Sequence, residues 1–321
     1  MVESEAAAAA TEGETAGVAE LPIRDVAQRT GVNPVTLRAW ERRYGLLKPS
    51  RSGKGHRLYR EADVQRIEDI LTWLARGVAI SKVRPLLEQD NVGPVAADSW
   101  SQQVAGTCNA VEAFDARTLQ RQLRQLLAGY PLALLLDRWL VPVHRALSRQ
   151  RRFGASASSG FFWEQMSEQL TIGLHASRKN LKQSGDRGPR LLLVTFAGTE
   201  QQVFAQLFAA ALMAAGIDVV SLGAGVELAE LAYAEEKLGA CGTICYSHNA
   251  LPMALLGSGL ERGLGNLGGP LWFAGGIVDL QRRDLQKFAR HHNCRLLPAA
   301  AGASLAQLKE ALREHFPEAR Q

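Results

Sequence analysis

The sequence predicts three folded parts: an N-terminal winged helix-turn-helix domain at residues 21–90, a small helical bundle at 105–186 and a parallel α/β domain at 187–321. Three observations favour this multidomain α plus α/β organisation. The chain has 321 residues, of which 46% are apolar, enough for two or three cores. A basic segment near the N-terminus has the periodicity of short helices separated by a glycine-containing turn. The last third alternates apolar strands with helices.

Charge is unevenly distributed along the chain. The 37 Lys and Arg residues against 32 Asp and Glu leave a net charge of +5. Residues 1–20 hold five glutamates and no base, and this stretch, too poor in apolar bulk to order itself, is predicted to be a disordered tail. Residues 36–60 hold eight bases against Glu41 alone, a pattern typical of a segment that binds a polyanion.

Cysteine spacing and hydropathy narrow the class of protein. The four cysteines lie apart without CxxC pairing, so neither a disulfide framework nor a zinc site is predicted. The sequence has no leader pattern, and its apolar runs are shorter than the roughly 18 residues of a membrane span. We therefore expect a cytoplasmic protein without a metal centre.

The N-terminal domain is predicted to begin with two short helices. Apolar residues at helical spacing follow Ile23, and a turn comes at Gly31. Asn33 is a good N-cap and Pro34 suits the first helical position, so the second helix is expected to run from Pro34 to Arg43. Helix, glycine turn and helix together are the pattern of a helix-turn-helix motif.

This second helix has an apolar side and a basic side. At about 100° per residue, Leu37, Trp40 and Tyr44 fall on one side, which is expected to pack, with Trp40 as a core anchor. The other side is expected to face outward, and its arginines suit contacts to phosphates and guanine edges. The residues expected on that side are Thr36, Arg38, Ala39, Arg42 and Arg43, and all except the alanine are candidate DNA contacts.

A hairpin and two more helices complete the domain. Residues 46–51 and 56–59 are predicted to form the two strands of a wing, joined by a basic tip. Residues 61–76 have the periodicity of an amphipathic helix that ends at Gly77, and a last short helix is expected at residues 80–87.

The string NPVTLRAWERRYGLLKPSRSGKGHRLYREADVQRI resembles the DNA-binding domain of MerR-family regulators. In that family a recognition helix ending R-x-W-E-R-R-Y-G precedes a wing ending G-x-R-x-Y. NPVTLRAW and the long C-terminal region resemble the MlrA-like branch, which is related to cobalamin-binding photoreceptor regulators. The resemblance implies that Arg38, Arg42 and Arg43 contact an operator. It also implies that phosphates are held by Tyr44, Arg51, Lys54, His56, Arg57 and Tyr59.

Residues 91–104 are predicted to be a linker, and helical periodicity resumes in the bundle. The long heptad helix through which many MerR-type proteins dimerise is missing, so a homodimer would have to form through the later domains. In the last third, strands are expected at 190–196, 218–222, 242–246 and 271–274, and helices at 202–215 and 228–238. This alternation is typical of a flavodoxin-like (Rossmann-like) sheet with ligand space at the carboxyl ends of its strands.

A bundle followed by such a sheet resembles the cobalamin-binding module of the same MerR branch. In that module a G-x-x-H loop supplies the imidazole that ligates cobalt, whereas this chain has a glutamine at the fourth position, Gln201. The Glu-His pair usual in the bundle reads Glu168-Gln169 here, so its histidine is absent as well. An amide is a poor substitute for imidazole on cobalt.

We therefore expect a degenerate ligand pocket that binds neither cobalamin nor another known cofactor. By the resemblance, it is lined by Gly198, Gln201, Ser247, Gly275 and Gly276 together with Glu168 and Gln169 of the bundle. Such a C-terminal part would bind another effector, a protein partner or a second copy of the chain.

Two function classes remain possible at this point. The first is an activator, a homodimer that binds an inverted repeat in double-stranded DNA. The resemblance implies that it underwinds a promoter for RNA polymerase. The second is a cobalamin- or nucleotide-using enzyme with a DNA-binding domain attached. Gly223-Ala-Gly225 lacks the third glycine of a dinucleotide fingerprint, and His248 is expected to be a hydrogen-bonded loop histidine rather than a base. No catalytic residue is therefore predicted.

Overall fold

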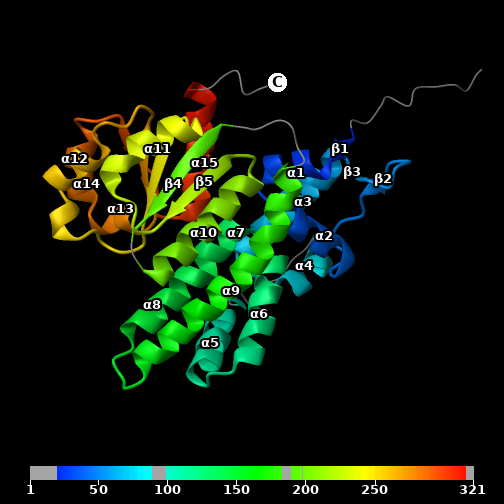
Figure 1. Cartoon of the computed structure of the whole chain (residues 1–321). Coiled ribbons are helices and arrows are strands. Elements are labelled where there is room, and N and C mark those ends of the chain that lie inside the picture. The colour runs from blue at the N-terminus through cyan, green and yellow to red at the C-terminus, as the bar shows by residue number, and fades with distance from the viewer. Residues whose placement is uncertain (1–19, 89–98, 183–188, 197, 316–321) are drawn as a thin grey trace, which may run out of the picture.

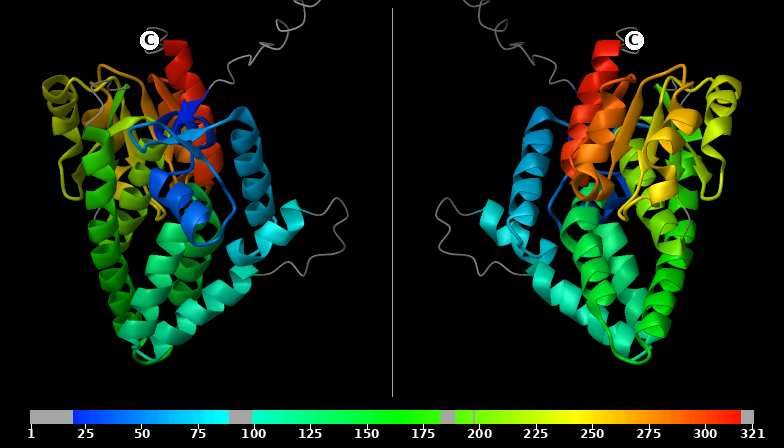
Figure 2. Two further views of the ribbon diagram at one scale, coloured as in Figure 1. Left: turned by 90° about the vertical axis from the view of Figure 1, so that its right-hand side faces the viewer. Right: turned by 90° about the vertical axis from the view of Figure 1, so that its left-hand side faces the viewer.

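The computed structural model describes residues 20–88, 99–182, 189–196 and 198–315. We call residues 20–88 the head, residues 99–182 the bundle and the remainder the α/β domain. Figure 1 shows the head in blue to cyan, the bundle in green, and the α/β domain from green to red. The head and the α/β domain lie side by side at one end of the bundle, as both views of Figure 2 show.

The head consists of short helices around a small antiparallel sheet. Its elements are β1 (Leu21–Pro22), α1 (Ile23–Thr30), α2 (Pro34–Arg42), β2 (Ser50–Arg51), β3 (Arg57–Tyr59), α3 (Glu61–Ala75) and α4 (Ile80–Leu87). The Asn33 side chain accepts a hydrogen bond from the Thr36 backbone N–H at 2.9 Å, which confirms the predicted N-cap of α2. The sheet order β1-β3-β2 adds one strand to the predicted wing. A two-residue strand has no periodicity, so only its pairing reveals it.

The bundle begins earlier than predicted. Its elements are α5 (Ser99–Glu112), α6 (Ala116–Gly129), α7 (Leu132–Leu135), η1 (Leu136–Leu140), α8 (Val141–Arg149) and α9 (Ala155–Lys182). The linker prediction is wrong for residues 99–104, because Trp100 docks there and its Nε1 donates to the Leu74 carbonyl at 3.0 Å. Residues 91–98 of the linker and 1–19 of the tail lie outside the described residues. Within the described ranges, none of the helices combines the length and apolarity needed to cross a membrane.

The π-helical turn η1 lies between α7 and α8 and interrupts an otherwise α-helical run from Leu132 to Arg149. Pro142 explains it, because proline has no N–H to donate to the carbonyl of Arg138 four residues earlier. Two neighbouring side chains of this turn anchor different parts of the molecule. The Asp137 carboxylate accepts hydrogen bonds from the first two backbone N–H groups of α15, at 2.7 and 3.1 Å. Arg138 donates to the Ala75 carbonyl of the head at 2.8 Å.

The α/β domain is a five-stranded parallel sheet covered by helices. Its strands are β4 (Arg190–Thr195), β5 (Asp218–Gly223), β6 (Thr243–Tyr246), β7 (Leu271–Ala274) and β8 (Cys294–Leu296). Its helical segments are α10 (Thr199–Ala214), η2 (Leu228–Glu230), α11 (Leu231–Leu238), η3 (Met253–Leu255), α12 (Ser258–Leu264), α13 (Ile277–Leu280), α14 (Arg282–Ala289) and α15 (Ala301–His315). The strand order β5-β4-β6-β7-β8 confirms the predicted flavodoxin-like sheet and adds an edge strand, β8.

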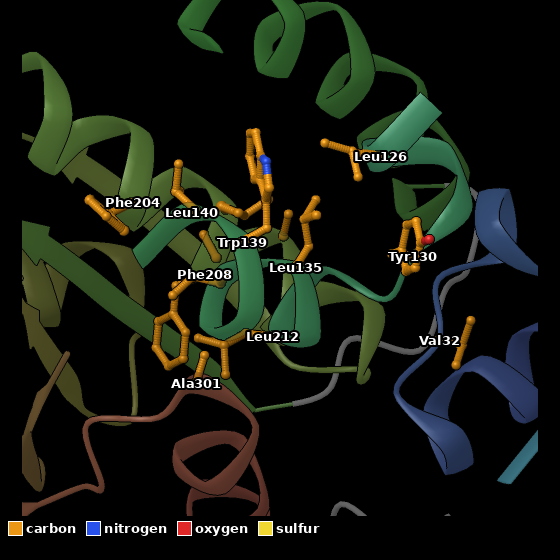
Figure 3. Close-up of a cluster of buried hydrophobic side chains, with 14 of the residues drawn as sticks. Val32, Leu126, Tyr130, Leu135, Trp139, Leu140, Phe204, Phe208, Leu212 and Ala301 are labelled. Atoms are coloured by element: carbon orange, nitrogen blue, oxygen red, sulfur yellow. The ribbon is translucent and has the colours of Figure 1, made fainter. Parts of the chain in front are cut away.

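One hydrophobic core runs through all three parts. Figure 3 shows it as a cluster with Val32 from the head, Trp139 from the bundle, and Phe208 and Ala301 from the α/β domain. Alternate residues of β4 divide between this core and a second one, as expected for side chains that point to opposite faces of a sheet. The bundle therefore fixes both the head and one face of the sheet.

Candidate nucleic-acid interface and the crevice of the α/β domain

The outward end of α2 presents an open basic surface. Arg42 and Arg43 are exposed at its C-terminal end, as predicted from the helical periodicity. Arg38, one turn earlier, is half-buried and lines a cavity between the head and α10. The three arginines thus have two different surroundings, although the sequence places them on one side of the helix.

Two residues expected on the outward side of α2 are buried instead. Thr36 is 0% exposed and Ala39 is 9% exposed, so the prediction that they face outward is wrong. The reason is that α2 packs against α6 of the bundle as well as against α1 and so has more than one covered side. Trp40 marks this second contact, because its Nε1 donates to the Gly129 carbonyl at 2.8 Å.

The wing is fastened to α2 by one carboxylate. Glu41 forms an ion pair with Arg57 and lies 3.4 Å from the nearest Arg51 nitrogen. The hydrogen bond that Arg57 Nε donates to Glu41 raises the pKa of the Arg57 guanidinium. Lys54 and His56 lie at the exposed tip of the wing. The wing therefore presents its tip and Arg51 to a partner, whereas Arg57 is occupied inside the head.

Two tyrosines predicted to hold phosphates pack against other parts of the protein instead. Tyr59 is 0% exposed, and burial raises its pKa to about 12. Its hydroxyl is inaccessible, so the prediction of a phosphate contact is wrong for this residue. Tyr44 is half-buried, and its hydroxyl lies against the bundle, 3.4 Å from where a Cβ would stand at Gly129. Both rings support the position of α2.

The crevice of the α/β domain lies where the strand order reverses, between the carboxyl ends of β4 and β6. Gln201 of α10 spans it. Its Oε1 accepts hydrogen bonds from the Ser247 hydroxyl at 3.2 Å and from the His248 backbone N–H at 2.8 Å. The side chain is 1% exposed. The amide therefore satisfies the polar groups of Ser247 and His248 from within the chain.

Aromatic side chains fill the space between this crevice and the bundle. The His248 ring packs on Phe204 with centroids 4.1 Å apart, and its Nε2 shares a 2.9 Å hydrogen bond with the Tyr246 hydroxyl. His144 and Trp163, from α8 and α9, pack on Phe204 with centroid distances of 5.4 and 5.5 Å. Burial lowers the pKa of His248 to about 3, so the ring is neutral near pH 7.

The glycines predicted to line the pocket let the strand ends approach closely. A Cβ at Gly275, whose φ is +89°, would lie 2.4 Å from the Ser247 carbonyl oxygen. A Cβ at Gly276 would lie 3.1 Å from the His248 carbonyl oxygen. The structure brings together Gly198, Gln201, Ser247, Gly275 and Gly276 at this edge of the sheet.

The bundle pair does not join this group. Glu168 is exposed and Gln169 is buried on α9, while the polar partners of the Gln201 side chain are Glu200, Ser247 and His248. Sequence analysis missed Glu200, which accepts from the Asn249 amide at 2.5 Å, and it missed the aromatic filling. Periodicity predicts that Trp163 and Phe204 are buried but not that they meet. Across the described residues, no cluster of three or more metal-ligating side chains is found.

Comparisons with known proteins agree with the geometry of the head. Residues 21–90 match the family described as MerR HTH family regulatory protein. The chain is 38% identical over 129 residues to the HTH-type transcriptional regulator MlrA of Escherichia coli (strain K12), covering 40% of this chain and 52% of that protein. It is 31% identical over 135 residues to the HTH-type transcriptional repressor CarH of Myxococcus xanthus, covering 38% and 44%. The matches thus span about half the length of these relatives.

Two solved structures are similar to about two thirds of the chain. One is the monomethylamine corrinoid protein of Methanosarcina barkeri, with a TM-score of 0.46, 16% identity, and coverage of 66% of this chain and 99% of that one. The other is a cobalamin-binding protein from Desulfitobacterium hafniense DCB-2, with a TM-score of 0.32, 15% identity, and coverage of 65% and 98%. Residues 21–90 of the chain are therefore similar to the helix-turn-helix domain of MerR family regulatory proteins.

Proposed function

We propose that the chain is a sequence-specific DNA-binding transcription regulator, and not an enzyme, that acts in the cytoplasm as a homodimer on an inverted-repeat site. One observation carries this proposal. Arg42, Arg43, Lys54 and His56 are exposed on one helix end and the adjacent wing tip, and within the described chain none has an ion-pair partner. Basic side chains without an ion-pair partner on a helix and a wing suit the major groove and its flanking phosphates.

Each part of the head has a distinct task in this proposal. Arg42 and Arg43 read base edges or adjacent phosphates from the groove, and Lys54 neutralises a phosphate beside it. Glu41 is a positioning residue, because its ion pairs with Arg51 and Arg57 set the angle between wing and helix. Thr36 and Tyr59 have no direct contact with DNA, because they are buried.

The sign of regulation follows from promoter geometry in this proposal. A dimer that underwinds a promoter with an overlong spacer would help RNA polymerase to engage it, and the chain would then be an activator. The alternative is repression, since the Myxococcus xanthus relative is named a transcriptional repressor. Transcription in vitro from the bound promoter, with and without the protein, distinguishes the two: more transcript supports activation, and less transcript contradicts it.

The C-terminal part is proposed to be an interaction or effector module that has lost its cobalt ligand. Cobalamin does not fit the residues present. The Gln201 amide is committed to Ser247 and His248, and Phe204 packs against both His248 and Trp163 between the crevice and the bundle. A bulky ligand there would have to displace a packed core, at a cost of several kcal/mol on the scale of roughly 3–5 kcal/mol for one aromatic side chain.

The experiment that tests the proposal is sequencing of the DNA fragments bound by the full chain in cells. The expected result is a shared inverted repeat. The variant Arg42→Ala with Arg43→Ala should lose enrichment at these sites, whereas Arg151→Ala, on an exposed loop of the bundle, should retain it. Random fragments from the wild-type protein, or equal enrichment in the double variant, would exclude the assignment of the interface.

A further inference from the structure

A cavity of about 230 Å³ lies between the head and the α/β domain. On one side it is bounded by α1 and by the first turns of α2, and on the other by the C-terminal end of α10. Its walls are mainly apolar and include Pro34, Val35, Leu132, Ala210 and Met213. It is separate from the crevice at the strand ends, with which it shares no lining residue.

One cation of this cavity is not neutralised. Arg24 also lines the cavity, but it faces Asp25 at 3.7 Å. Arg38 is half-buried, and among the residues that the structure describes its guanidinium has neither a hydrogen-bond acceptor nor a carboxylate partner. A half-buried guanidinium beside apolar walls is a strong site for an anion, because its planar donors match a carboxylate in a bidentate arrangement.

The two sides of the cavity are held at a fixed spacing. Lys309 of α15 donates to the Gln28 carbonyl of the head at 2.6 Å. Gly216, with φ at +88°, lies so close to the head that a Cβ there would be 3.0 Å from the Gln28 side chain. These two contacts lie beside the cavity and hold the head against the α/β domain. The cavity therefore has walls at a fixed distance from each other.

We propose that this cavity binds a small amphipathic monoanion, an apolar body with one carboxylate. The carboxylate would pair with Arg38 while the body contacts Leu132 and Met213. A single free guanidinium neutralises a single charge, and a dianion would leave a charge unpaired beside apolar walls. At the packing density of protein interiors, about 230 Å³ holds on the order of ten non-hydrogen atoms, which is the size of octanoate.

The location couples the ligand to DNA, and this step rests on the proposed function. Arg38 belongs to the same helix as Arg42 and Arg43, and a bound carboxylate would neutralise it and brace α2 against α10. Ligand and operator would then weaken each other by the same factor. Binding of the ligand itself does not depend on that step.

The test uses the full chain without DNA, with octanoate as the probe and octanol as its uncharged counterpart, measured by calorimetry. Octanoate should bind at least about ten-fold more tightly than octanol. Ala214→Leu fills the cavity from α10 and should weaken octanoate about ten-fold or more. The matched control is Ala146→Leu, which adds the same atoms to a different cavity beside Trp100 and should change the affinity by less than about two-fold.

Arg38→Met keeps the side-chain length but removes the charge, so it should abolish the preference for octanoate over octanol. If Ala214→Leu does not fold, Arg38→Met by itself tests whether the carboxylate pairs with Arg38. Absence of octanoate binding, equal binding by Ala214→Leu, or equal binding of octanol by the wild type overturns the proposal. If octanoate binds as expected but no DNA site exists, the proposed function fails while this inference stands.

Discussion

Two regions of the molecule differ in whether their polar groups have partners. One is the basic end of α2 with the wing tip, and the other is the crevice at the strand ends. At the first, Arg42, Arg43 and Lys54 are exposed and have no ion-pair partner in the described structure. At the second, Gln201 satisfies its neighbours from within and is 1% exposed. The edge of a parallel sheet can thus have its polar groups satisfied from within the chain. Function is indicated by unsatisfied groups, not by the sheet edge itself.

The largest expected effect tests whether the crevice is a packed core. Phe204 is 0% exposed and contacts His144, Trp163 and His248. Phe204→Ala should lower the free energy of unfolding by about 3–5 kcal/mol in chemical denaturation. Leu280→Ala, at a position 61% exposed, is the control and should change it by less than about 0.5 kcal/mol. A loss below about 1 kcal/mol for Phe204→Ala would mean that the crevice is loosely filled and open to a ligand.

The next effect sharpens the description of the head. Arg42→Ala should weaken operator binding by about 1–3 kcal/mol if the guanidinium reads a base, and the loss should be smaller for unrelated DNA. Lys54→Ala should weaken binding to all sequences alike and reduce the slope of log affinity against log salt by about one. Fluorescence anisotropy at several salt concentrations measures both. A uniform loss for Arg42→Ala would show that it contacts phosphate only.

A smaller effect concerns pH. His248 has a pKa lowered to about 3 in the folded chain, chiefly by burial and further by His144, against an ordinary value of 6.5. Between these values the unfolded chain binds a proton that the folded chain does not, so the free energy of unfolding falls as pH falls below 6.5. The contribution is at most about 1.4 kcal/mol per pH unit. His248→Gln should flatten this part of the curve, and an unchanged slope would contradict the burial of a neutral ring.

The smallest expected effect is none at all. Adenosylcobalamin mixed with the purified chain should leave the cobalamin absorbance spectrum unchanged, and operator affinity should be equal in the dark and in the light. The reason is the engaged Gln201 amide in a filled crevice. Gln201→His with Gln169→His is the reverse experiment, and partial recovery of binding would support loss of the ligand as the cause. A stoichiometric coloured complex with the wild type would contradict the closed crevice.

Local signals were sufficient for much of the fold. Asn33 and Pro34 fix the start of α2, and the alternation of apolar strands and helices predicts the parallel sheet. β8 escaped prediction because Arg295 interrupts its apolar character and only its pairing with β7 defines it. The start of α5 escaped because Trp100 is ordered by the Leu74 carbonyl, far away in the sequence.

The sites were predicted less completely, for a physical reason. A helical periodicity describes one helix and cannot include a neighbour, so Thr36 was placed outside although α6 packs beside α2. Gln201 was recognised as a departure from a motif. Its bridge to Ser247 and His248 joins positions more than 40 residues apart and could not be predicted from spacing.

The bond from Trp40 to the Gly129 carbonyl limits how such a protein can be recombined. The inner side of the helix that would enter DNA is also part of the joint with the bundle. The arginines at its outer end are exposed, and their side chains have no hydrogen-bond or ion-pair partner among the described residues. New target preferences can therefore arise by exchange of a few exterior side chains. A whole head transplanted from a relative would need a compatible partner for its tryptophan, and chimeras that move the head with α6 should fold more readily than those that move it alone.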